Sequence, residues 1–252
     1  MLRVIGIAVA FLAMQIVVSV LIAAGYAIFN RALPHAILIE ILTSIISNLA
    51  IIFVLWKIKY VDAKRFFLKN TSWLNLLLMV VMLMSASFSC SVLEEMLQIP
   101  DNMAEIFPLI MNNPLGIVAL AIIAPIAEEV VFRGAILGHL LENTKWDYRL
   151  SILVSALVFG VIHLNPIQIV FATIIGLLLG WAYWRTRSLL PCILMHVANN
   201  SWAVVGNFID SGNGETMQQE VGTIATLGII LGAASVAALL FFFLRKRMPM
   251  EA

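Results

Sequence analysis

The sequence predicts an all-α integral membrane protein, a bundle of about eight transmembrane helices, from two observations. Of its 252 residues, 62% are hydrophobic and 12% are charged, whereas a soluble chain averages about 45–50% apolar and about 25% charged residues. The apolar residues also stand in runs long enough to cross a bilayer, which takes about 20 residues of helix. The net charge of +1 lacks the basic excess that is typical of nucleic-acid-binding proteins.

Eight apolar runs are the expected spans. The first begins next to Arg3, as a signal peptide would, but it exceeds the ~7–15 residues of a signal peptide's apolar region, so we expect it to be retained as a helix. The fifth is the shortest, and Asn165-Pro166 separates it from the sixth. The expected spans are residues 4–29, 36–56, 73–93, 114–141, 149–164, 166–184, 188–209 and 221–244. Without a long linker between them, residues 1–252 are predicted to form a single membrane domain.

The basic residues predict the orientation of these spans, because Lys and Arg concentrate on the cytoplasmic side of a membrane protein. With a cytoplasmic N-terminus, 13 of the 15 basic residues lie inside, all except Arg31 and Arg133. An even number of spans returns the C-terminus to the same side. The predicted location is therefore a bacterial inner membrane, crossed several times. These 13 residues are Arg3, Lys57, Lys59, Lys64, Arg65, Lys69, Lys145, Arg149, Arg185, Arg187, Arg245, Lys246 and Arg247.

Three charged residues stand in the middle of the fourth span, where each ionisable group costs at least ~2.5–3.5 kcal/mol. They are Glu128, Glu129 and Arg133. Glu129 and Arg133 are four residues apart and face one another along a helix, whereas Glu128 points about 100° away. We therefore expect Arg133 to neutralise Glu129 and Glu128 to be left to act as a general base. The alternative is a structural ion network that braces the bundle.

Two further spans carry polar residues that belong with this set. His163 ends the fifth span, while His196 and Asn200 are four residues apart on the seventh and share a face. His139, near the end of the fourth span, is expected at the membrane interface and is left out of the site. A glutamate and a histidine can deprotonate a water, and a histidine with a carboxamide can donate to a developing oxyanion. These residue types favour hydrolysis of an acyl bond.

Three short patterns carry a resemblance to a known family. They are EExxxR at residues 128–133, FxxxH at 159–163 and HxxxN at 196–200. Together they resemble the CAAX-protease and bacteriocin-processing family, which includes the type II CAAX prenyl endopeptidases. The patterns fall within residues 114–209, the predicted peptidase core, and the first three spans and the last carry none of them.

The resemblance implies an all-helical intramembrane peptidase that cleaves a membrane-associated peptide or protein. By this resemblance Glu128 is the general base, and His163 helps to orient the attacking water. His196 and Asn200 would form the oxyanion hole, and the ion pair of the fourth span would support the site. The first competing interpretation is a non-enzymatic immunity or scaffolding protein. The second is a small transporter or proton relay, which is disfavoured because the sequence lacks the internal repeats that are common in transporters.

Metal use stays open at the level of the sequence. Two histidines and a glutamate form a known catalytic zinc set, so zinc bound by Glu128, His163 and His196 is one expectation, although no HExxH pattern occurs. We favour a metal-free mechanism slightly, because Asn200 is a poor zinc ligand and a good oxyanion donor.

The depths of the two histidines set a geometric condition on this site. At ~1.5 Å per residue, His163 lies roughly 20 Å from the cytoplasmic end of its span and His196 about 12 Å from that of its own. Straight helices would separate them. Tilting, or a turn submerged at Asn165-Pro166, would bring them level.

Overall fold

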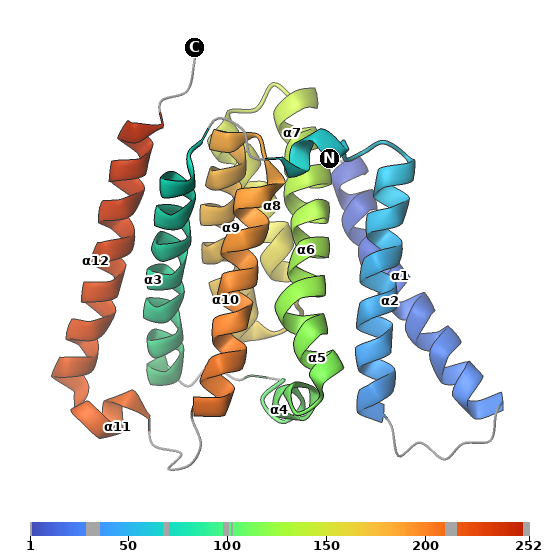
Figure 1. The fold of residues 1–252 in the computed structure, drawn as a ribbon, viewed down its shortest axis with the longest axis horizontal. Coiled ribbons are helices and arrows are strands. Elements are labelled where there is room, and N and C mark those ends of the chain that lie inside the picture. The colour runs from blue at the N-terminus through green and yellow to red at the C-terminus, as the bar shows by residue number, and fades with distance from the viewer. Residues whose placement is uncertain are drawn as a thin grey trace.

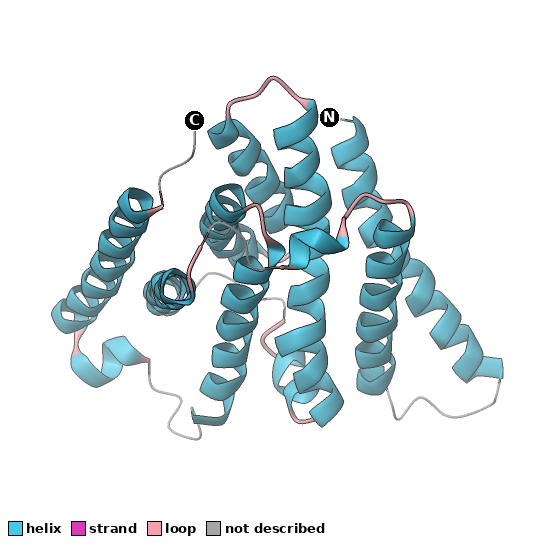
Figure 2. Ribbon diagram, turned by 45° about the horizontal axis from the view of Figure 1, so that its top comes forward, coloured by secondary structure: helices cyan, strands magenta, loops and turns pink. Residues whose placement is uncertain are grey.

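The computed structural model describes residues 2–28, 36–67, 71–97, 101, 103–209 and 216–248, and in these residues all regular structure is helical. Long helices stand side by side (Figures 1 and 2). The all-α prediction is confirmed. The helices outside the motif region are α1 (Leu2–Ile28), α2 (Ala36–Lys57), the short η1 (Ala63–Phe66), α3 (Trp73–Leu97), α4 (Ile106–Met111), α11 (Met217–Val221) and α12 (Thr223–Arg247).

The motif region contains one long composite helix and three further helices. Residues 114–143 are continuous and consist of α5 (Pro114–Val118), η2 (Ala119–Ile123), α6 (Ala124–Glu129), η3 (Val130–Leu137) and α7 (Gly138–Asn143). We call this composite the motif helix. It is followed by α8 (Tyr148–Val161), α9 (Pro166–Thr186) and α10 (Leu189–Ile209).

The number of spans differs from the expected eight. Seven helices of the described residues are long and apolar enough to cross a membrane. The fifth expected span, 149–164, is the 14-residue α8, and at ~1.5 Å per residue its ~21 Å fall short of the ~30 Å hydrocarbon core. The chain still reverses at α8, so Leu2 of α1 and Arg247 of α12 lie at the same end of the bundle (Figure 1).

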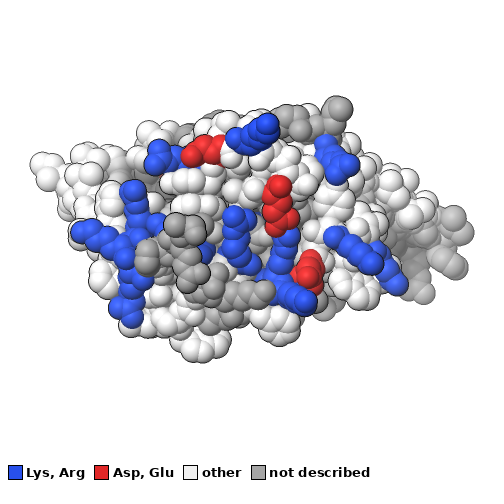
Figure 3. All heavy atoms as spheres, turned by 90° about the horizontal axis from the view of Figure 1, so that it is seen from above, with Lys and Arg blue, Asp and Glu red and all other residues white. Residues whose placement is uncertain are grey.

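The basic segments lie at one end of the bundle, as predicted. The last residue of α2, the α7–α8 and α9–α10 connections and the last turn of α12 all lie at the upper end in Figure 1. Lys and Arg side chains are spread over this end in Figure 3, with few acidic ones among them. Arg31 and Lys69 lie outside the described residues. That this end faces the cytoplasm stays a prediction from the positive-inside rule.

Two π-helical stretches, η2 and η3, interrupt the motif helix. In η2 the N–H of Ala124 reaches back five residues to the carbonyl of Ala119. The next such bond would join Leu120 O to residue 125, but Pro125 has no N–H to donate. A carbonyl in the membrane interior is thereby released for a side chain of another helix, and π-bulges of this kind occur frequently at functional sites.

The α8–α9 hairpin is packed closely because small residues face each other across it. A Cβ added at Gly160 would lie 2.6 Å from the carbonyl oxygen of Ile169, and one added at Gly176 would lie 3.1 Å from Cβ of Ala156. No larger side chain fits at these positions without movement. The hairpin turn, Ile162–Asn165, contains His163, so this packing fixes the place of a predicted site residue.

Candidate active site

A buried three-residue cluster joins α6 and η3 of the motif helix to α10. Arg133 Nη1 donates to Glu129 Oε1 at 2.8 Å, and both side chains are fully buried. The imidazole of His196, also buried, places Nδ1 2.8 Å from the same carboxylate oxygen. The predicted pairing of Glu129 with Arg133 is confirmed. What the spacing did not predict is that His196 of α10 shares this carboxylate.

Arg133 is also fixed by its other contacts. Its Nη2 donates to the carbonyl of Gly176 on α9 at 3.2 Å, and its guanidinium lies over the ring of Phe159 on α8, 4.5 Å from the centroid. One arginine thus connects the motif helix to both helices of the α8–α9 hairpin. A buried cation without such contacts would be strongly destabilising.

The pairing of Glu129 determines the proton on His196. A carboxylate held by an arginine only accepts hydrogen bonds, so Nδ1 of His196 must be the donor in this contact. In the neutral imidazole the lone pair is then on Nε2, and this atom lies 3.6 Å from Oε2 of Glu128. Glu128 keeps a 17% exposed side chain, so it is the accessible carboxylate of the two. The imidazole therefore stands between a fixed glutamate and an accessible one.

Asn200 lies on the same face of α10 as His196, as its spacing predicts. Its Nδ2 donates at 3.0 Å to the carbonyl of Leu120, the group left free by Pro125. Its Oδ1 accepts from Nδ2 of Asn199 at 3.3 Å. These two bonds hold the carboxamide in one orientation and leave its second N–H to donate.

His163 lies apart from this cluster. It is half-buried in the hairpin turn, and its Nδ1 is 2.8 Å from the carbonyl of Phe159 in its own helix. Within the described residues, neither a hydrogen bond nor an ion pair joins it to Glu128. The rings of His163 and His196 instead both meet Phe159 edge to face, at centroid distances of 5.0 and 5.8 Å. The turn after α8 thus places both histidines in contact with one aromatic ring.

Phe159, the first residue of the FxxxH pattern, has no role predicted from the sequence but lies at the centre of these contacts. It is 2% exposed and contacts Arg133, His163 and His196. Its signal in the sequence was its position four residues before His163, which places both on one face of a helix. Ser155, one turn earlier, donates to the carbonyl of Phe132 at 3.0 Å and ties the same face of α8 to η3.

The residues do not fit the expected zinc set as they are placed. Zinc binds its ligands at about 2.0–2.2 Å from a common point, and among the described residues no three His, Cys, Asp or Glu side chains converge in this way. One ring nitrogen of each histidine is engaged, by Glu129 and by the Phe159 carbonyl, as is usual for metal-binding histidines, so the misfit lies in where the donors are placed and not in these bonds.

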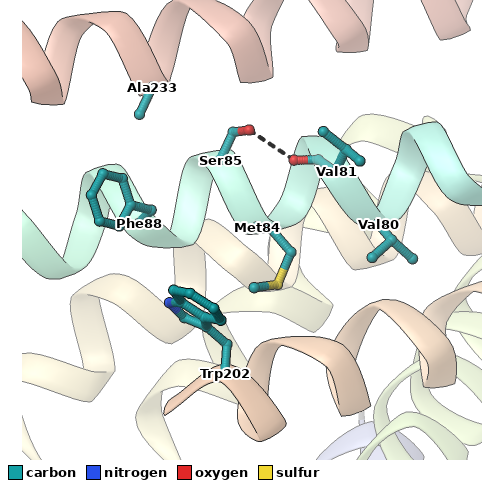
Figure 4. Close-up of a pocket in the computed structure, with 7 residues that line it drawn as sticks. All are labelled: Val80, Val81, Met84, Ser85, Phe88, Trp202 and Ala233. Atoms are coloured by element: carbon teal, nitrogen blue, oxygen red, sulfur yellow. Dashed lines mark hydrogen bonds between the residues drawn. The ribbon is translucent and has the colours of Figure 1, made fainter. Parts of the chain in front are cut away.

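A separate apolar groove lies between α3, α10 and α12. Its volume is about 350 Å³, and its lining is Val80, Val81, Met84, Ser85, Phe88, Trp202 and Ala233 (Figure 4). The Ser85 hydroxyl in its lining bonds to the carbonyl of Val81 in its own helix (Figure 4). None of the predicted site residues, all of which are described, lines this groove.

Fold and apolar surface define a multi-pass integral membrane protein with a carboxylate–imidazole–carboxamide site in its interior. Residues 110–202 match the family model described as type II CAAX prenyl endopeptidase Rce1-like. This segment contains all three sequence patterns, so the resemblance they predicted is confirmed for this part of the chain.

Two bacterial proteins are similar to the chain. "Putative membrane peptidase YdiL" of Bacillus subtilis (strain 168) is 30% identical over 105 residues, 42% of this chain and 42% of that protein. "Membrane-embedded CAAX protease MroQ" of Staphylococcus aureus (strain USA300) is 28% identical over 114 residues, 43% and 45% of the two chains. The matched segment thus spans less than half of each relative. No solved structure matches the chain significantly.

Proposed function

We propose that the chain is a CAAX-type intramembrane endopeptidase, which hydrolyses a peptide bond in a membrane-associated substrate. The observation that carries this proposal is His196, held by the fixed Glu129 at 2.8 Å and facing the accessible Glu128 at 3.6 Å. Burying two carboxylates and an imidazole together in a membrane interior is costly unless they serve a function. The similarity of this region to membrane peptidases supports the same class.

In the proposed reaction, Glu128 takes a proton from a water molecule whose oxygen attacks the carbonyl carbon of the scissile bond. His163 would orient this water: its Nδ1 donates to the Phe159 carbonyl, so Nε2 of the neutral ring accepts an O–H. The tetrahedral intermediate then collapses, the C–N bond breaks, and the amine leaves with the proton that Glu128 received.

The negative oxygen of the intermediate would be stabilised by α10. Asn200 has one N–H in use at Leu120 and a second to donate. His196 can donate only when Nε2 carries a proton, because Nδ1–H is engaged by Glu129. Nε2 would hold the proton that Glu128 took from the water while the intermediate exists, and would return it to Glu128 before the amine leaves with it. Removing a single oxyanion donor typically lowers kcat about 10²–10³-fold.

Zinc dependence is the alternative within this proposal. A zinc ion held by Glu128, His163 and His196 would activate the water directly, but the donors as placed do not converge. We propose the glutamate-dependent mechanism, in which Glu129 and Arg133 act as supports and no cofactor takes part.

The test is cleavage of a quenched-fluorescent peptide library by the protein in liposomes, with and without a chelator. We expect cleavage by the wild type, and a loss of about 10²–10⁴-fold in Glu128→Gln, the range for a general base. Undiminished cleavage by Glu128→Gln would contradict the assignment of the base. Loss of activity with chelator and its return with zinc would contradict the metal-free mechanism. If the wild type cleaves nothing, the non-enzymatic interpretation replaces the peptidase.

A further inference from the structure

Asn199 of α10 is a partly buried polar residue at an unspecified position of the HxxxN pattern. At ~1.5 Å per residue it lies about 15 Å from the start of α10 at Leu189, which is the middle of a ~30 Å bilayer core. Its Nδ2 donates to Oδ1 of Asn200 at 3.3 Å, and its own Oδ1 has no hydrogen-bond partner within the described residues. A polar group at this depth is costly unless it serves a function, and the one hydrogen bond of this side chain is to Asn200.

The direction of this bond follows from the backbone of the motif helix. A carbonyl oxygen only accepts hydrogen bonds, so Asn200 must turn its NH₂ group toward the carbonyl of Leu120, as Nδ2 does at 3.0 Å. Its oxygen then faces Asn199, where a second amide oxygen would repel it. Asn199 must therefore present its own NH₂ group. One backbone carbonyl thus sets the orientation of both carboxamides.

The orientation of Asn200 decides whether it can stabilise an oxyanion. The last torsion of an asparagine side chain is broad and roughly two-fold, so a rotation of about 180° exchanges the NH₂ group for the oxygen. In the proposed reaction this rotation would turn a partial negative charge toward the developing negative charge. The Leu120 carbonyl opposes the rotation at the nitrogen, and Asn199 opposes it at the oxygen. A donor held in this way needs no reorganisation when the charge develops.

We infer that Asn199 is a positioning residue, which holds the carboxamide of Asn200 so that its second N–H stays available to the oxyanion, an inference that rests on the proposed function. Within the described residues the side chain of Asn199 makes no hydrogen bond that would connect α10 to another helix. Asn75 of α3 differs in this respect. It is buried too, but its Oδ1 accepts from Nε of Arg247 at 2.6 Å and so ties α3 to α12.

The first experiment compares Asn199→Leu with the matched control Asn75→Leu, using the fastest-cleaved peptide of the library. We expect Asn199→Leu to lower kcat about 10–100-fold, the range for a misplaced group, with KM and the unfolding temperature nearly unchanged. Asn75→Leu should show the reverse, a lower unfolding temperature with the kcat of the wild type. An unchanged kcat in Asn199→Leu would overturn the inference. Equal losses of kcat in both variants would also overturn it, because the loss of any buried amide would then suffice.

A second experiment tests whether Asn199 acts through Asn200. Asn200→Leu removes the oxyanion donor and should lower kcat about 10²–10³-fold. The double variant Asn199→Leu/Asn200→Leu should be no slower than Asn200→Leu alone, because no carboxamide is left to orient. Losses that multiply in the double variant would overturn the inference and leave the proposed function intact.

A third variant separates the lost donor from the added apolar side chain. Asn199→Ala removes the same N–H without a leucine in its place, and we expect it to lower kcat by a similar factor. A wild-type kcat in Asn199→Ala would overturn the inference alone. Absence of cleavage by the wild-type protein would overturn the proposed function, and this inference with it.

Discussion

The motif helix and α12 are nearly equal in apolar character and opposite in their surroundings. Their mean hydropathies are 2.2 and 2.6, yet 50% of the most apolar window of the motif helix is buried inside the protein, against 11% for α12. α12 packs mainly on α3 at one side of the bundle, whereas the motif helix contacts α1, α2, α8, α9 and α10 (Figure 1).

This difference shows what each kind of residue indicates in a membrane protein. Apolar runs identify the spans, because lipid and protein interior are equally apolar. Polar residues identify the central span, because each must find a partner inside the bundle. Glu129 and Arg133 have their partners on the motif helix, α9 and α10, in the middle of the bundle. The polar contacts of α12 with other long helices of the described chain are the Ser89–Ile230 bond and the bonds of Arg245 and Arg247 in its last turn.

The largest effect is expected from breaking the central ion pair. Arg133→Leu leaves Glu129 buried without its cation, so we expect a loss of about 3–5 kcal/mol in the free energy of unfolding. Titration with a denaturing detergent measures this. The double variant Glu129→Leu/Arg133→Leu should lose less than Arg133→Leu alone, because it leaves no unpaired charge. A double variant less stable than either single one would contradict this account.

The next effect concerns η1, the short helix between α2 and α3, which Arg65 holds against the motif helix. Arg65 of η1 donates to the Gly134 carbonyl, to the Tyr183 hydroxyl at 2.7 Å and to Glu142 at 2.8 Å. Burial lowers the pKa of its guanidinium, but Tyr183 and Glu142 raise it more, so the net shift is upward and the charge is kept.

Arg65→Ala should therefore destabilise the protein by about 1.5–3 kcal/mol, the range for hydrogen bonds to a charged group. The same detergent titration measures the loss. Lys64, beside it, is exposed and serves as the control, since Lys64→Ala should change little. Equal losses in both variants would show that η1 is not held by Arg65.

Helix packing gives the third comparison, between Gly160 in the core and Gly228 on α12. A Cβ at Gly160 meets the Ile169 carbonyl at 2.6 Å, whereas one at Gly228 meets nothing within 4 Å. Gly160→Ala should cost about 1–3 kcal/mol through overpacking, while Gly228→Ala should be neutral or stabilise by roughly 0.5–1 kcal/mol. Unfolding midpoints of the two variants measure the contrast, and similar values would contradict it.

The smallest effect is expected at the α3–α12 contact. Ser89 donates to the Ile230 carbonyl at 3.0 Å, and Ser89→Ala should cost about 0.5–1.5 kcal/mol. Ser85→Ala is the control, because that hydroxyl bonds within its own helix. A loss in Ser89→Ala as large as that in Arg133→Leu would remove the distinction between core and periphery.

The sequence predicted the parts of this site that depend on helix periodicity. The four-residue spacing gave the Glu129–Arg133 pair and placed His196 and Asn200 on one face, as the structure shows. Apolar runs predicted the seven long helices of the described residues. They also predicted an eighth span, which in the structure is α8 and is too short to cross a membrane by itself. Contacts between helices could not be read in this way, because they depend on how the helices tilt and turn.

Three features of the site depend on how the helices are placed and bent, and so could not be predicted from the sequence. Sharing of Glu129 by His196 needs α10 to lie against α6. The release of the Leu120 carbonyl depends on η2 being π-helical ahead of Pro125, and nothing in a hydrophobic pattern marks a π-helix. The contact of His196 with Phe159, at a centroid distance of 5.8 Å, joins α10 to α8 and depends on how these two helices are placed.

The central claim is that Glu129 is fixed by Arg133 and His196, so that Glu128 is the glutamate left to act. The most direct test measures unfolding temperature and peptide cleavage together in Glu128→Gln and Glu129→Gln. We predict that Glu128→Gln loses cleavage and keeps the wild-type unfolding temperature. Glu129→Gln should lose cleavage and also unfold at a lower temperature than the wild type. A stable Glu129→Gln variant, or an unstable Glu128→Gln variant, would contradict the division of roles between the two glutamates.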